Sequence, residues 1–97
     1  MSDSEQLRLH AIVKGRVQGV GFRAFVVENA VVIGAVGWAR NRWDGSVEVM
    51  AEGDRETLEK LLAVLQRGPR VSKVTQVDHE WGAASGEFRS FQVKSTF

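Results

Sequence analysis

The chain contains no cysteine, and this absence excludes several kinds of chemistry at once. Without thiols the protein cannot form disulfides, bind a metal through thiolates or use a cysteine nucleophile. An excess of one charge is also lacking: the formal net charge is +1, so bulk electrostatics do not indicate a nucleic-acid partner. The length of 97 residues suits one domain, predicted over residues 1–97, that buries its own core.

A long hydrophobic run and a secretion signal are missing as well. The longest apolar stretch, at residues 30–37, is much too short to span a bilayer. Residues 1–6 are polar and acidic, which is unlike the start of a secreted protein. We therefore expect a cytoplasmic protein that does not associate with membranes.

A glycine-rich run at residues 15–23 reads Gly-Arg-Val-Gln-Gly-Val-Gly-Phe-Arg. It has neither the Gly-Lys-Ser/Thr ending of a nucleotide-binding P-loop nor the glycine spacing of a dinucleotide-binding turn. Its glycines allow backbone N–H groups to face a ligand, a helix beginning near Phe22 adds a positive dipole end, and Arg23 adds a forked cation. The run predicts a cradle for a small dianion such as a phosphate group, with a plain turn as the alternative.

Periodicity predicts both strands and helices along the chain. Residues 7–14 alternate between apolar and polar side chains, as in a half-buried strand. In residues 22–33 the spacing favours a helix, although many of the residues are β-branched and disfavour one. Asp54 is a good N-cap for a second helix, which Gly68 and Pro69 end. The expected elements are strand 7–14, helix 22–33, strand 36–42, strand 46–52, a helix between residues 54 and 68, strand 71–81 and strand 88–93.

This order of elements predicts a ferredoxin-like α/β sandwich, βαββαβ, with one short extra strand. Right-handed crossovers give an α+β protein whose antiparallel sheet carries both helices on one face. On the first helix, the predicted core face consists of Phe22, Phe25, Val26, Asn29 and Ile33.

Asn41 stands at the end of the second predicted strand. Its amide offers an acceptor and two donors, so it could hold a water molecule in line with a bound phosphorus atom. This requires the glycine-rich loop to fold over the sheet toward that strand. The alternative is a strand-end residue that only begins a turn.

Two segments of the chain together resemble the acylphosphatase family. They are residues 15–23 and residues 37–48, the latter reading Gly-Trp-Ala-Arg-Asn-Arg-Trp-Asp-Gly-Ser-Val-Glu. The resemblance covers essentially the whole chain and implies the ferredoxin-like sandwich. It also implies hydrolysis of acyl phosphates to a carboxylate and inorganic phosphate without a metal or cofactor, with inorganic phosphate as product or inhibitor.

The resemblance also assigns roles to particular residues. The family's phosphate-binding arginine falls on Arg23, and its water-orienting asparagine falls on Asn41. It further implies that the substrate phosphate assists as the base, so that no catalytic histidine or carboxylate is required. The implied phosphate cradle consists of the backbone of Gln18, Gly19, Val20, Gly21 and Phe22.

The first helix departs from the family pattern. Val27, Val31 and Val32 stand where many relatives carry charged or polar residues. Helical spacing places Val27 and Val31 away from the predicted core. We therefore expect a monomer with an exposed apolar stripe that supports weak self-association.

Other polar residues receive simpler interpretations. His10 and His79 lack the spacing of metal ligands, so they are expected at the surface or an edge, and no metal site is predicted. Arg16, Arg40 and Arg42 either steer anions or are merely solvated. The acidic residues expected to form a solvated helix start are Glu52, Asp54, Glu56 and Glu59.

Two other functions are compatible with the predicted fold. One is a catalytically silent domain that keeps the phosphate cradle. The other is a nucleic-acid-binding module, which needs aromatic residues at alternate positions of the central strands. The strand at 7–14 carries aliphatic residues there instead, so we expect no nucleic-acid partner.

Overall fold

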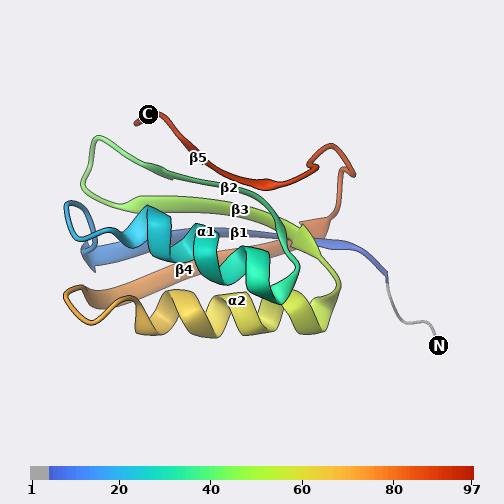
Figure 1. Cartoon of the computed structure of the whole chain (residues 1–97), viewed down its shortest axis with the longest axis horizontal. Helices are drawn as coiled ribbons and strands as arrows, with labels where there is room; N and C mark the ends of the chain where they lie inside the picture. Colours follow the sequence, from blue (N-terminus) through green and yellow to red (C-terminus); the bar gives the residue numbers. More distant parts are fainter. Residues whose placement is uncertain (1–4) are drawn as a thin grey trace.

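The structure, a computed structural model, describes residues 5–97 as a five-stranded sheet with two helices packed on one face (Figure 1). The strands follow the spatial order β4-β1-β3-β2-β5, and the predicted ferredoxin-like arrangement is confirmed. Part of the polar start, residues 1–4, lies outside the described residues. The elements are β1 (Leu7–Arg16), α1 (Phe22–Ile33), β2 (Val36–Asn41), β3 (Val47–Gly53), α2 (Arg55–Arg67), β4 (Lys73–Ala83) and β5 (Phe91–Lys94).

The sheet is mixed, whereas the sequence predicted an antiparallel one. β1 pairs antiparallel with β3 and β4, and β2 pairs antiparallel with β3. β5 runs parallel to β2, with Ala39 opposite Val93. The direction of an edge strand depends on how the preceding segment returns along the sheet, which side-chain periodicity does not encode. β4 begins at Lys73 and β5 at Phe91, later than the predicted strands at 71–81 and 88–93, because each strand begins where it first has a register partner on its neighbour.

Both helices end where the sequence predicted. The Asp54 carboxylate accepts a hydrogen bond of 2.8 Å from the Thr57 N–H at the start of α2. At the C-terminal end of α1, the N–H of Gly34 donates to the carbonyl oxygen of Ala30 at 2.8 Å. These caps fix how far each helix runs across the sheet.

The core lies between the helices and the sheet face that they cover. On α1 the buried face is centred on Phe22, Val26 and Ala30, spaced four residues apart. The predicted face was therefore partly wrong, because Phe25 and Asn29 are only half-buried. The sheet and α2 contribute the fully buried residues Leu9, Ala11, Val13, Ala39, Val47, Val49, Ala51, Leu58, Leu61 and Leu65.

The predicted valine stripe on α1 is smaller than expected. Val27 packs against the core, so the expectation that it points away was wrong. Val31 and Val32 are 63% and 85% exposed. The exposed part of the predicted stripe thus consists of these two residues, and both weak self-association and the monomeric state stay predictions.

Gly37 on β2 provides a direct test of the strand packing. Its φ is +143°, and an added Cβ would overlap the backbone carbonyl oxygen of Met50 on β3. Gly37→Ala should lower the free energy of unfolding by at least about 2 kcal/mol, because both strain and overlap oppose it. Urea denaturation measures this, with Gly82→Ala as the control, since a Cβ at Gly82 meets open space. Equal free energies of unfolding for the two variants would contradict the close packing of Gly37 against β3.

Two carboxylates lie buried on the sheet face away from the helices. Glu48 is 8% exposed and Glu52 is 3% exposed, so the prediction of a solvated Glu52 was wrong. Glu48 contacts His10 at 2.6 Å and accepts a hydrogen bond from Arg40 at 2.7 Å. Glu52 accepts hydrogen bonds from the N–H groups of the 85–86 turn. His10 is thus part of an internal polar network rather than a simple surface residue.

The buried carboxylates should make the free energy of unfolding depend on pH in the acid range. Burial raises the pKa of Glu48, but its hydrogen bonds with His10 and Arg40 outweigh burial and hold the pKa below its usual value. A lowered folded-state pKa stabilises the protein above the unfolded pKa of about 4.3, and this contribution is lost as pH falls. Urea denaturation from neutral pH downward should show the loss below about pH 5. Glu48→Gln should reduce this dependence but not abolish it, because the pKa of Glu52 is also lowered, whereas the exposed-site control Glu56→Gln should leave it unchanged.

Candidate active site

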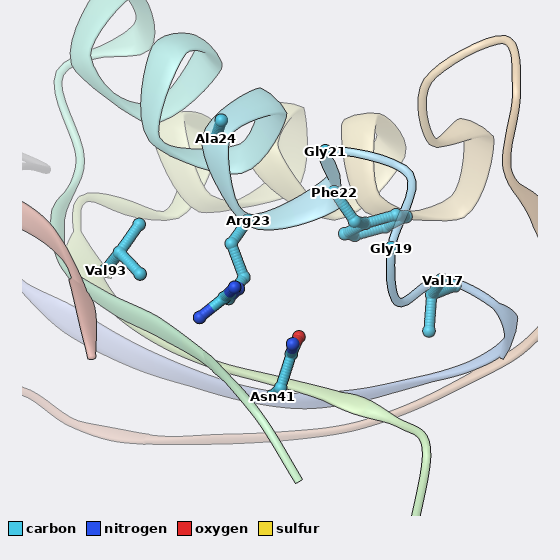
Figure 2. Close-up of a pocket in the computed structure, with 8 residues that line it drawn as sticks. All are labelled: Val17, Gly19, Gly21, Phe22, Arg23, Ala24, Asn41 and Val93. Carbon is cyan, nitrogen blue, oxygen red and sulfur yellow. The ribbon is translucent and has the colours of Figure 1, made fainter. Parts of the chain in front are cut away.

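The loop between β1 and α1 lies over the end of β2 and forms a cavity of about 220 Å³ with it (Figure 2). Three of its walls are the loop itself, the first turn of α1 and Asn41 at the end of β2. Val93 of β5 completes the lining opposite the loop (Figure 2). The cavity therefore joins segments that are distant in sequence, although β3 separates β1 from β2 in the sheet.

The loop leaves a row of backbone donors without protein partners. Gly19 and Gly21 have φ values of +74° and +75°, which glycine adopts most readily. Gly21 is also the N-cap of α1, and the first turn of that helix contains no acidic residue. Within residues 5–97, no N–H from Gly19 to Ala24 donates to a protein acceptor. Such donors at the positive end of a helix form a ready anion site, which goes beyond a plain turn.

Arg23, the second residue of α1, points into the cavity toward Asn41 (Figure 2). It is half-buried, and its guanidinium makes no ion pair or hydrogen bond in the part of the chain that the structure describes. Arg8 and Arg40, in contrast, each bind a buried carboxylate. A half-buried cation without a counterion is unfavourable unless a ligand supplies the negative charge. The position of Arg23 therefore suits an anion held by the loop.

Asn41 faces Arg23 from the opposite wall of the cavity (Figure 2). Its backbone carbonyl oxygen accepts a hydrogen bond of 3.0 Å from the N–H of Phe97, which fixes the strand end. Its side-chain amide has no hydrogen-bond partner among the described residues. Both functions of the amide are thus available to a ligand or a water molecule.

The predicted cradle divides into two groups. Gly19, Gly21 and Phe22 line the cavity together with Arg23 and Asn41. Two other predicted members do not line it.

Gln18 turns away from the cavity, and its amide donates to the carbonyl oxygens of Arg42 and Ser46. Val20 packs partly buried against the core. Both residues keep their places in the loop backbone.

Sequence reasoning missed two apolar parts of the lining. Val17 belongs to the glycine-rich run but was given no role, and it is nearly fully buried. Val93 reaches the cavity only because β5 pairs with β2 in parallel, so no local signal marks it.

Of the three arginines that either steer anions or are merely solvated, Arg40 fits neither interpretation. Arg40 binds Glu48 on the other face and lies over the rings of Trp38 and Phe97, so it does not steer ligands into this cavity.

In the part of the chain that the structure describes, histidines and carboxylates are absent from the cavity lining. Across residues 5–97, no group of three or more histidine, aspartate or glutamate side chains gathers as metal ligands do. None of the helices in the same range is long and apolar enough to cross a membrane. The chemistry of the cavity thus rests on backbone N–H groups, one guanidinium and one amide.

A ferredoxin-like sandwich with an anion site at the start of its first helix defines a class of phosphate-binding α+β proteins. Comparison with known proteins makes the assignment specific, because the family model described as Acylphosphatase matches residues 9–93. The chain belongs to the acylphosphatase family.

Individual acylphosphatases match this chain over nearly their full length. The acylphosphatase of Thermus thermophilus is 52% identical over 86 residues, which are 89% of this chain and 97% of the relative. That of Koribacter versatilis is 45% identical over 97 residues, all of this chain and 87% of the relative. The crystal structure of an acylphosphatase from Bacillus subtilis has a TM-score of 0.87 at 38% identity, covering 91% of this chain and 98% of that one. The chain is thus an acylphosphatase enzyme that acts on acyl phosphates.

Proposed function

We propose that this protein hydrolyses the carboxyl–phosphate bond of acyl phosphates without a metal ion. The 15–23 loop and Arg23 hold the phosphoryl group, and Asn41 orients the attacking water. One observation carries the proposal: the same cavity is lined by loop residues with free N–H groups, by a guanidinium without a counterion and by an unbonded amide, as judged over residues 5–97. These are the groups that phosphoryl transfer requires for positioning and charge stabilisation.

The loop and Arg23 stabilise charge on the phosphoryl group. In phosphoryl transfer the transition state is loose, and negative charge spreads over three equatorial oxygens. The N–H groups between Gly19 and Ala24 have no acceptor within residues 5–97, and the forked donors of Arg23 already point into the cavity (Figure 2). Because they need no reorganisation during the reaction, they lower the barrier rather than only binding the substrate.

Asn41 places the nucleophile. Its side-chain oxygen accepts a hydrogen bond from a water molecule, which attacks phosphorus in line with the leaving carboxylate. The new P–O bond forms as the bond to the acyl oxygen breaks, and that bond's electron pair leaves on the carboxylate. A phosphoryl oxygen receives the proton of the water. The leaving carboxylate is a weak base, so it needs no general acid.

The composition of the cavity supports the absence of protein acid–base catalysis. No histidine or carboxylate of residues 5–97 lines the cavity, so none of these residues supplies a strong base or a ligand set for a metal there. We also keep the expectations of a monomeric single-domain protein in the cytoplasm.

Removal of metal ions tests this function. Benzoyl phosphate hydrolysis should be unchanged after dialysis against a strong chelator, because no step involves a metal. Inorganic phosphate should inhibit competitively, since it occupies the same loop. Activity that disappears with the chelator and returns with a divalent cation would contradict the proposal.

A further inference from the structure

Gln18 carries the only polar side chain in the loop of residues 17–21, and it does not face the cavity. Its Nε2 donates to the carbonyl oxygen of Arg42 at 2.7 Å and to that of Ser46 at 2.8 Å. Both acceptors belong to the turn between β2 and β3, and Gln18 is half-buried beside them. One amide nitrogen therefore uses both of its hydrogens to connect the loop to this turn.

The two acceptors lie directly beside the site. Arg42 follows Asn41 in the chain, and Ser46 precedes Val47, which is the register partner of Asn41. The N–H of Arg42 also donates to the carbonyl oxygen of Ser46 at 2.9 Å, which closes the turn. Gln18 thus bonds to both ends of the turn that follows Asn41.

This connection matters because the two halves of the site come from strands that are not neighbours. The loop follows β1, Asn41 ends β2, and β3 lies between them. Among residues 5–97, the two bonds from Gln18 are the only hydrogen bonds between residues 17–21 and residues 41–47. Without them, the loop would be connected to Asn41 only through apolar packing and through the sheet, in which Val47 pairs with both Val13 and Asn41.

We propose that the side chain of Gln18 is a positioning residue, which holds Asn41 in place relative to the phosphate loop. The inference rests on the proposed function and adds a role beyond the backbone cradle. A misplacement of about 1 Å can cost about 100-fold in rate. Loss of these bonds should therefore lower kcat by about 10- to 100-fold. Affinity for inorganic phosphate should change by less than about 3-fold, because its binding groups are the loop N–H donors and Arg23.

Gln18→Glu is the sharpest variant, because it keeps the shape and removes both donors. At neutral pH the introduced carboxylate faces two carbonyl oxygens, which raises its pKa. As pH falls, its protonated form regains one O–H donor to this turn. The ratio of variant to wild-type kcat should therefore rise as pH is lowered from 7 toward about 4.5, which a merely destabilised loop would not show.

The controls separate charge, folding and function. Gln66→Glu on the exposed side of α2 makes the same charge change away from the site and should keep wild-type kcat. Gln18→Met removes the donors without adding charge, so its kcat should fall without recovery in acid. Circular dichroism establishes that each variant is folded, and calorimetry measures its affinity for inorganic phosphate.

Two outcomes would overturn the inference while leaving the proposed function intact. One is an active wild type with unchanged kcat in Gln18→Glu and Gln18→Met. The other is a parallel loss of kcat and phosphate affinity that acid does not reverse, which would make Gln18 part of the loop's own folding. A wild type without turnover would instead reject the proposed function. The activity of the wild type is therefore measured before that of any variant.

Discussion

Arg23→Ala should lower kcat/KM for benzoyl phosphate by at least about 10²–10³-fold, the usual loss for a transition-state donor. Its affinity for inorganic phosphate should fall as well, by at least about 10-fold, because hydrogen bonds to charged groups contribute about 1.5–3 kcal/mol. The guanidinium has no protein partner within residues 5–97, so the free energy of unfolding should not fall. Steady-state kinetics, calorimetry and urea denaturation measure these three quantities.

Two further variants make the Arg23 result specific. Arg23→Lys keeps the charge but loses the planar fork, so it should recover only part of the activity. Arg70→Ala removes an exposed arginine from the segment between α2 and β4 and should leave both kcat/KM and phosphate affinity unchanged. Near-normal turnover in Arg23→Ala would reject its role.

Asn41→Ala should also lower kcat by about 10²–10³-fold, but through a different loss. The amide orients water and is not proposed to bind the phosphoryl group, so affinity for inorganic phosphate should stay within about 3-fold of wild type. Steady-state kinetics and calorimetry on the same samples separate the two effects. This pattern, lost kcat with retained phosphate binding, distinguishes Asn41 from Arg23.

Asn29→Ala is the matched control, since Asn29 is the only other asparagine of the chain. Its side chain donates to the carbonyl oxygen of Phe25 within α1, so its removal should leave kcat near the wild-type value. If Asn41→Ala lost phosphate affinity as strongly as kcat, Asn41 would be a binding residue and the assignment of the water would be wrong.

The sequence predicted the parts of the fold that depend on local physics. The alternation of β1 and the side-chain cap of Asp54 are properties of a few neighbouring residues. The order of these elements then leaves few possible topologies, because crossovers are right-handed. Burial of Glu48 and Glu52 was not predictable in this way, because their partners come from other strands and from the 85–86 turn.

The candidate active site likewise combines features that neighbouring residues determine with features that distant contacts determine. The residues 15–23 indicated an anion cradle from glycine and charge alone, whereas Asn41 stayed open between a water-holding amide and a turn residue until the resemblance to a family assigned it a role. The direction of the Gln18 side chain and the presence of Val93 depend on contacts between distant strands. Local periodicity carries no information about such contacts, so these features required the structure.

The position of bond cleavage tests the central claim most directly. Wild-type protein hydrolyses benzoyl phosphate in water labelled with heavy oxygen, with a chelator present, and mass spectrometry locates the label in the products. Attack of an oriented water on phosphorus places the label in inorganic phosphate and none in benzoate. Label in benzoate would show attack at the acyl carbon and would contradict the roles assigned to the loop, Arg23 and Asn41.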